Sequence, residues 1–298
     1  MNPDFAAITE AIAAAGGPRV VADRAVRVGG GSISAAWVLA GPDGRCFVKT
    51  NDAGFAPNFA AEADGLAALG HAAVPRSLTF IARGVVGATA FLALEFLDLR
   101  PLDRESGRLL GGQLAQLHRQ TGETFGWHAD NFIGATPQRN APHPGWPHFF
   151  AAQRLLPQLE LAARNGMDTL LVKAGRAIAD NLGGLFIDYR PRPSLLHGDL
   201  WSGNAAAMAD CTPVLFDPAC YHGDREADIA MAELFGGFPE SFHVAYREAW
   251  PLDSGYETRK TLYNLYHVLN HFNLFGAAYL GQARRMIEQL NRELRRLP

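Results

Sequence analysis

The feature that most constrains the fold is a run of polar residues framed by two apolar segments. Residues 195–204 read LLHGDLWSGN, and residues 214–218 read VLFDP. If the residues between these segments form a β-hairpin, its two ends bring Asn204 and Asp217 back toward each other. Amide and carboxylate oxygens suit a hard divalent cation, so the hairpin predicts a site for Mg²⁺.

The spacing H-x-D-x-x-x-x-N, followed by an apolar strand that ends in Asp, supplies the side chains that phosphoryl transfer from ATP requires. Asp199 would be the catalytic base that orients the attacking hydroxyl, while Asn204 and Asp217 would hold Mg²⁺. The alternative reading takes Asp199 and Asn204 as turn formers, because Asp and Asn are common in turns. The conjunction with elements of the first hundred residues favours catalysis.

The first of these elements is a turn between two predicted strands, formed by Gly29, Gly30, Gly31 and Ser32. Its backbone amides could lie over phosphates without obstruction by side chains, although glycine-rich turns are also common as purely structural features. Lys49 closes the third predicted strand, residues 46–50, as the nucleotide-binding lysine of kinases does.

The second element is Glu62, which lies on the apolar face of a helix predicted over residues 58–69. An acid on such a face needs a cationic partner, and Lys49 needs an anchor for its ammonium group. We therefore expect Lys49 and Glu62 to pair and to bind the nucleotide. The alternative is a solvent-exposed lysine and a tolerated helix acid.

The order of predicted elements divides the chain into two lobes. We predict an α+β, protein-kinase-like fold, with a small antiparallel β-sheet lobe that binds nucleotide over residues 1–97. A helical lobe with the catalytic loop and acceptor site would cover residues 98–298, and Mg-ATP would bind in the cleft between the lobes.

By analogy with kinases, the adenine edge would meet the backbone of Glu95, Phe96 and Leu97. Helices are expected at residues 5–15, 58–69, 108–120, 146–165, 169–181, 228–235, 238–249, 255–275 and 280–294.

Composition restricts the partners and the compartment. The 27 basic residues nearly balance the 30 acidic residues, so we expect no binding to nucleic acid or to a membrane surface. The most apolar stretch, residues 85–97, is too short to span a bilayer. Three cysteines without a C-x-x-C motif, and an N-terminus without the basic start of a signal peptide, predict a cytoplasmic protein. The sequence leaves the oligomeric state open.

Five segments carry a resemblance to a known family: FGWHADNFIGATPQ (125–138), FFAAQRLLPQLELA (149–162), LLHGDLWSGN (195–204), FDPACYHGDREADIAMAELFGGF (216–238) and YHVLNHFNLFG (266–276). They resemble the fructosamine kinase (ketosamine 3-kinase) family, from the glycine-rich turn almost to the C-terminus. The Trp201-Ser202 pair is the most specific piece, because the related aminoglycoside phosphotransferases and choline kinases usually have other residues there.

The resemblance implies ATP-dependent phosphorylation of a ketoamine, such as fructoselysine or ribuloselysine, at the 3-hydroxyl. The family's product is unstable and releases the amine, so the implied role is deglycation. Trp201 would line the sugar site, and the alternative is a core tryptophan that shapes the loop. Some family members carry a redox-sensitive cysteine in the glycine-rich loop, where this chain has Ser32, so we expect no thiol switch there. An aminoglycoside- or choline-type phosphotransferase and a non-catalytic pseudokinase are the alternative functions.

Two further clusters have structural readings. Asp224, Glu226 and Asp228 could be mistaken for a metal site, but Asp228 would open a helix and hold the backbone of the catalytic loop. His267 and His271 have a spacing that suits zinc, but without a third ligand a packed or hydrogen-bonded pair is expected. The segment 140–146 is rich in proline, so the sequence does not determine the structure of the acceptor-site wall there.

Overall fold

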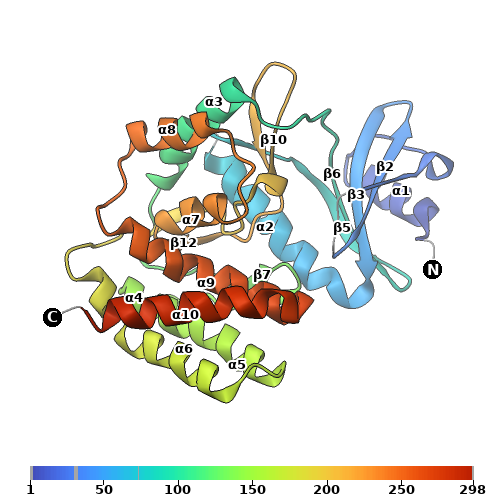
Figure 1. The fold of residues 1–298 in the computed structure, drawn as a ribbon. Coiled ribbons are helices and arrows are strands. Elements are labelled where there is room, and N and C mark those ends of the chain that lie inside the picture. The colour runs from blue at the N-terminus through green and yellow to red at the C-terminus, as the bar shows by residue number, and fades with distance from the viewer. Residues whose placement is uncertain (1–2, 30–32, 73, 297–298) are drawn as a thin grey trace. The chain divides into compact units, whose positions relative to one another are not determined.

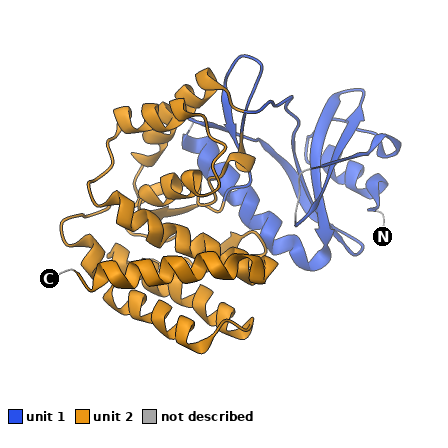
Figure 2. Ribbon diagram, in the orientation of Figure 1, with its two compact units in different colours: residues 1–101, 206–218 blue, residues 102–205, 219–298 orange. Residues whose placement is uncertain are grey.

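The chain folds into two compact units, which Figure 2 shows in different colours. Unit 1 comprises residues 1–101 and 206–218, and unit 2 comprises residues 102–205 and 219–298. The computed structural model describes residues 3–29, 33–72 and 74–296.

This division differs from the predicted one in two respects. The first unit extends to residue 101 instead of residue 97. The segment 206–218, which we placed in the helical lobe, belongs to unit 1 because its hairpin adds to a strand of that unit.

Unit 1 is built on an antiparallel sheet. Its strands are, in spatial order, β1 Val26–Val28, β2 Ala35–Gly41, β3 Gly44–Asp52, β6 Thr89–Glu95 and β5 Phe80–Val86. The consecutive strands β1, β2 and β3 form the antiparallel meander that the turns between them predict.

Helices cover the two faces of this sheet (Figure 1). On one face, α1 (Phe5–Ala14) buries Ile8 and Ile12 in a core that includes Phe91 and Ala93 of β6. On the other face, α2 (Ala56–Ala72) buries apolar side chains against alternate residues of the same strand, Ala90, Leu92 and Leu94. Strand β6 is therefore buried on both faces, as its nearly unbroken apolar sequence requires.

A short hairpin completes unit 1. Strands β10 (Ala205–Ala207) and β11 (Pro213–Leu215) are neighbours in a small sheet, and β11 pairs in parallel with β4 (Arg76–Ser77). The amide of Met208 donates to the carbonyl of Thr212 at 2.9 Å and closes the loop. The predicted hairpin is confirmed, with Asn204 directly before its first strand and Asp217 two residues after its second.

Unit 2 is mostly helical. Its helices are α3 Arg104–His118, α4 Trp146–Phe150, α5 Leu156–Arg164, α6 Thr169–Asn181, α7 Glu226–Leu234, α8 Glu240–Ala249, α9 Tyr256–Phe275 and α10 Leu280–Leu294. Two short antiparallel pairs accompany them, β7 Asn131–Ile133 with β8 Thr136–Gln138, and β9 Ser194–Leu196 with β12 Tyr221–Gly223. Helices α5, α6, α9 and α10 pack together around a large apolar core (Figure 1). In the described part of the chain, no helix is both long and apolar enough to cross a membrane.

Candidate active site

Lys49 lies at the centre of a charged cluster in unit 1. It pairs across the sheet with Leu92, whose side chain lies in the core on the α2 side, so Lys49 also projects toward α2. Its ammonium nitrogen lies 2.7 Å from Glu62 Oε1 and 2.5 Å from Asp217 Oδ1. The expected contact between Lys49 and Glu62 is present, and the contact with Asp217 is one that the sequence did not indicate. The nucleotide-binding role of the pair stays a prediction.

Burial makes these charges sensitive to one another. The Lys49 and Glu62 side chains are only 12% and 15% exposed. Burial alone would lower the pKa of Lys49, but Asp217 and Glu62 outweigh it and the pKa is raised, so the ammonium stays charged. Burial, with a smaller contribution from Asp217, raises the pKa of Glu62 to about 7 despite the neighbouring ammonium. Two carboxylates around one ammonium leave an excess of negative charge that a divalent cation could neutralise.

Asp217 adopts an unusual backbone conformation. Its φ of 56° lies in the left-handed region, which residues other than glycine, asparagine and aspartate seldom adopt. This conformation directs its carboxylate to Lys49 from the end of the β10–β11 hairpin. Aspartate tolerates this conformation better than most residues, and sparsely populated backbone conformations are common at functional sites.

The loop that we predict to be catalytic follows β9 in unit 2. Gly198 has a φ of +82°, and a Cβ there would lie 2.1 Å from the carbonyl oxygen of Ala219, so only glycine fits this position. Further along the loop, the amide nitrogen of Asn204 donates to the Asp199 carbonyl at 2.9 Å and to its Oδ2 at 3.2 Å. The Asn204 side chain therefore fixes the carboxylate that we predict to be the base.

Asp228 holds this loop from α7. Its carboxylate accepts hydrogen bonds from the backbone amides of His197, at 2.7 Å, and Gly198, at 2.9 Å. Burial alone would raise the pKa of Asp228, but the hydrogen bonds from His118 and from the Gly198 amide help to lower it, so it stays ionised. The expectation that Asp228 holds the loop backbone is confirmed. Asp228 does not open the helix, however, because α7 (Glu226–Leu234) begins two residues earlier and Asp228 lies in its first turn.

The neighbouring acids are also structural. Asp224 accepts hydrogen bonds from Tyr189 at 2.9 Å and Tyr263 at 2.5 Å, and Glu226 pairs with Arg259 at 2.8 Å. Within residues 3–29, 33–72 and 74–296, no group of three or more His, Cys, Asp or Glu side chains could hold a metal ion. The hydrogen bonds of Asp224 and the ion pair of Glu226 support the reading of this acidic cluster as structural.

The histidine pair of α9 is packed as expected. His271 Nδ1 lies 2.8 Å from the carbonyl oxygen of His267. His267 is buried, and burial lowers its pKa to about 3, so its ring is neutral.

Trp201 is exposed to solvent over 39% of its surface, so the alternative reading as a core tryptophan is wrong. Its indole ring lies over Gly203, where a Cβ would approach ring carbon Cη2 to 2.2 Å. An aromatic face held in this way can pack on the C–H groups of a sugar, but that role stays a prediction.

The structure describes some of the other residues predicted to bind the nucleotide and does not describe the rest. Gly30, Gly31 and Ser32 lie outside the described residues, and at Gly29 a Cβ would meet no atom within 4 Å. The amide of Glu95 donates to the carbonyl of Thr79 at 2.9 Å, so that donor is already engaged within the sheet edge. The Glu95 carbonyl and the backbone of Phe96 and Leu97 could still meet an adenine edge, and that role stays a prediction.

The proline-rich segment 140–146 is fixed by Arg154. This fully buried side chain donates to Asn140 Oδ1 at 2.7 Å and to the Arg139 carbonyl, and its guanidinium lies 4.0 Å from the ring centre of Tyr221. At the other end of the segment, Trp146 is buried and begins α4. The sequence analysis did not identify Arg154. The one signal that could have indicated its burial is its position on a helix face.

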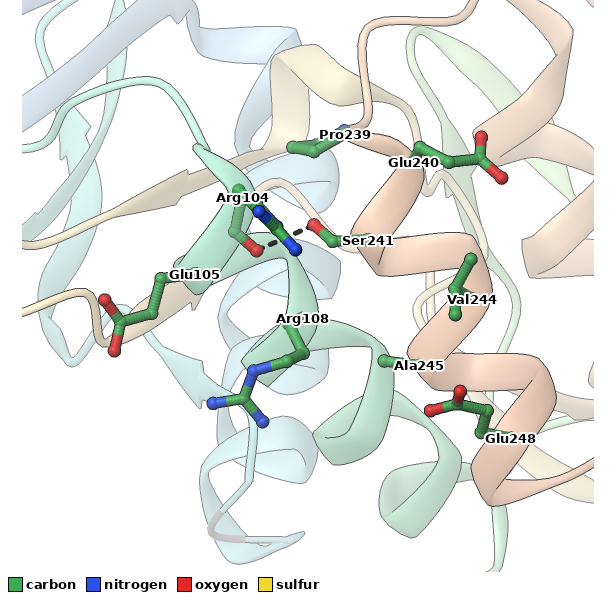
Figure 3. A pocket seen from close by; sticks show the side chains of 9 residues that line it. All are labelled: Arg104, Glu105, Arg108, Pro239, Glu240, Ser241, Val244, Ala245 and Glu248. Carbon is green, nitrogen blue, oxygen red and sulfur yellow. Dashed lines mark hydrogen bonds between the residues drawn. The ribbon is translucent and has the colours of Figure 1, made fainter.

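A surface hollow of about 830 Å³ lies along helices α3 and α8 (Figure 3). Its lining residues are Arg104, Glu105, Arg108, Pro239, Glu240, Ser241, Val244, Ala245 and Glu248. The Ser241 hydroxyl donates to the carbonyl of Arg104 at 2.7 Å. None of the predicted site residues that the structure describes lines this hollow.

Comparison with known proteins decides which family combines these features. The sequence model of the family described as fructosamine kinase matches residues 4–293. The chain belongs to the fructosamine kinase family. It is therefore an ATP-dependent kinase, as the catalytic-loop motif predicts.

Individual relatives agree with this family. The chain is 43% identical over 266 residues to the "Probable ketoamine kinase" of Vibrio cholerae, covering 89% of this chain and 91% of the relative. It is 39% identical over 271 residues to the chloroplastic protein-ribulosamine 3-kinase of Arabidopsis thaliana, covering 90% and 82%.

Solved structures show the fold. The structure of a fructosamine-3-kinase candidate from Thermobifida fusca superposes with a TM-score of 0.84 at 33% identity, covering 98% of this chain and 99% of the other. A choline/ethanolamine kinase family protein from Mesorhizobium loti has a TM-score of 0.58 at 14% identity, covering 91% of each chain. The predicted α+β, protein-kinase-like fold is confirmed.

Proposed function

We propose that this protein transfers the γ-phosphoryl group of ATP to a sugar hydroxyl of a ketoamine, with Asp199 as the base. Membership of the fructosamine kinase family supports phosphorylation of ketoamines. The observation that carries the residue assignment is the contact of Asn204 Nδ2 with Asp199 Oδ2 at 3.2 Å, which orients the Asp199 carboxylate within the H-x-D-x-x-x-x-N loop.

In the proposed reaction, the hydroxyl oxygen attacks the γ-phosphorus while the bond between that phosphorus and the oxygen of ADP breaks. Asp199 orients the hydroxyl and accepts its proton. Lys49, kept charged by Glu62 and Asp217, binds the phosphates of ATP. Little covalent chemistry is required of the protein, so positioning and charge neutralisation provide most of the rate.

We propose that Asn204 and Asp217 hold Mg²⁺. Asn204 and Asp217 provide an amide and a carboxylate, which are hard oxygen ligands, and phosphate oxygens of the nucleotide would complete the shell. Because Mg²⁺ in kinases is held by few protein side chains, the lack of a three-residue cluster in the described parts of the chain is compatible with such a site. The bound ion would neutralise charge on the phosphates.

The finer assignments are also proposals. The family resemblance favours the 3-hydroxyl as the acceptor, and the name of the Arabidopsis relative supports that position. Phosphorylation there would serve deglycation by releasing the amine. The three cysteines are thiols and not disulfides, which supports the cytoplasmic compartment we propose.

ADP release measured across several acceptors tests the substrate class. We expect turnover with ribuloselysine or fructoselysine, and much less with an aminoglycoside or choline. Turnover confined to the aminoglycoside or choline would favour the alternative phosphotransferase. No ADP release with any acceptor, despite ATP binding, would favour a pseudokinase.

A further inference from the structure

A chain of buried polar side chains in unit 2 ends at the catalytic loop. Arg225 Nη1 lies 3.2 Å from the hydroxyl oxygen of Tyr246, which lies 2.8 Å from His118 Nδ1. His118 Nε2 lies 3.2 Å from Oδ2 of Asp228, the residue that holds the loop amides. All four side chains are at least nine-tenths buried, so water does not substitute for these contacts.

The chemistry of the two end groups fixes the direction of the hydrogen bond at each end. A guanidinium can only donate and an ionised carboxylate can only accept. In the tautomer of His118 that carries its proton on Nε2, Nε2–H donates to Asp228 and Nδ1 accepts from the Tyr246 hydroxyl, whose oxygen in turn accepts from Arg225. Burial raises the pKa of Tyr246, so the phenol keeps the proton that it donates.

The packing of α3 against α8 sets the distances between these hydrogen-bonded side chains. His118 ends α3, and Tyr246 lies on α8. A Cβ at Gly111 of α3 would lie 2.3 Å from the carbonyl oxygen of Phe242 of α8, so the two helices are in close backbone contact. Arg225 also donates to the carbonyls of Trp250 and Pro251, which fixes the end of α8.

The contact between His118 and Asp228 bears on catalysis because the same carboxylate oxygen of Asp228 also holds the catalytic loop. Oδ2 of Asp228 accepts both from His118 and from the amide of His197, two residues before the proposed base. Rotation of this carboxylate would move the loop that carries Asp199. An error of about 1 Å in such positioning can cost roughly a hundredfold in rate.

We propose that His118 is a positioning residue for the reaction: it takes a hydrogen bond from Tyr246 and gives one to Asp228, and so holds the catalytic loop in register. This inference rests on the proposed role of Asp199. It also assigns a role to the packing of α3 against α8, which places Tyr246 next to His118 and which the sequence did not indicate.

The test compares His118→Leu, which removes both hydrogen bonds, with His118→Gln, which can accept from Tyr246 and donate to Asp228. Amide hydrogen exchange of residues 195–200 reports loop order without any substrate, and steady-state kinetics report kcat and KM separately. We expect His118→Leu to speed exchange in this segment and to lower kcat about tenfold or more, with KM for ATP changed less than twofold. His118→Gln should recover most of both properties.

Unchanged loop exchange in a folded His118→Leu variant would overturn the proposal, as would equal impairment of the Leu and Gln variants. If His118→Leu does not fold, Tyr246→Phe replaces it, with Tyr263→Phe as the matched control. Both substitutions remove a buried, hydrogen-bonded tyrosine hydroxyl. The Tyr263 hydroxyl donates to Asp224 and is not part of the series that ends at Asp228. Faster exchange of the loop only in Tyr246→Phe supports the proposal, and equal or no effects overturn it. A wild-type protein that phosphorylates no ketoamine would refute the proposed function, while the exchange data would still judge the positioning role.

Discussion

The ammonium of Lys49 lies 2.5 Å from the carboxylate of Asp217, although the two residues are 168 positions apart in the sequence. The lysine proposed to bind the nucleotide and the carboxylate proposed to bind Mg²⁺ therefore neutralise each other. Under these proposed roles, Mg-ATP would redistribute the pair on binding, because the phosphates would interact with the ammonium and Mg²⁺ with the carboxylate.

The Asp217→Asn variant tests the metal role. Because an amide has no charge to offer a cation, we expect Mg-ATP to bind at least tenfold more weakly, by titration calorimetry with and without Mg²⁺. Asp210→Asn, on the exposed loop of the same hairpin, is the control and should bind as the wild type does. Binding of Mg-ATP by Asp217→Asn within twofold of the wild type would remove Asp217 from the metal site.

Glu62 gives a pH dependence of known sign. Its pKa is raised from 4.5 to about 7 on folding, so the stability it contributes is present below pH 4.5 and is lost as the pH rises through 7. Relative to Glu62→Gln, the wild type should lose on the order of 2 kcal/mol of unfolding free energy between pH 4.5 and 8. Urea denaturation of both proteins at several pH values measures this, and a difference independent of pH would contradict it.

Two adjacent glycines of α3 offer a matched pair of substitutions. A Cβ at Gly111 would clash with the backbone of α8, whereas a Cβ at Gly112 would meet no atom within 4 Å. Gly111→Ala should destabilise the protein by about 1–3 kcal/mol, and Gly112→Ala should stabilise it by roughly 0.5–1 kcal/mol. Thermal unfolding distinguishes them, and a common sign would show that the helices are not in close contact there.

Trp201 should matter for the acceptor and not for stability. Because its ring is 39% exposed, Trp201→Ala should leave the unfolding temperature nearly unchanged. Loss of an aromatic face for the sugar should raise KM for a ketoamine about tenfold, while Trp201→Phe retains most of the affinity. An unchanged KM in the alanine variant would exclude Trp201 from the sugar site.

Much of the fold could be predicted because strong local signals agree with the final packing. Helices α6 and α10 have the predicted bounds, since their apolar periodicity and end residues coincide. Helix α3 begins at Arg104 instead of residue 108, because Asp103 and Ser106 form a capping box that we did not recognise. The helix predicted over residues 146–165 contains a π-helical turn at Ala151–Leu155, for which the sequence offers no period.

The candidate site divides in the same way. The contact between Lys49 and Glu62 was predictable because each side chain lacked a local partner. The contacts of Asp217 with Lys49, and of His118 with Asp228, depend on elements more than a hundred residues apart and have no local signal. The placement of residues 206–218 in unit 1 was missed because it depends on parallel pairing of β11 with β4.

Mass spectrometry of a ketoamine incubated with Mg-ATP tests the central claim most directly. The wild type should add one phosphoryl group to the sugar of ribuloselysine or fructoselysine. Asp199→Asn should add none on the same timescale while it still binds ATP, because only the base is removed. No phosphorylated ketoamine from the wild type, or comparable product from Asp199→Asn, would contradict the account.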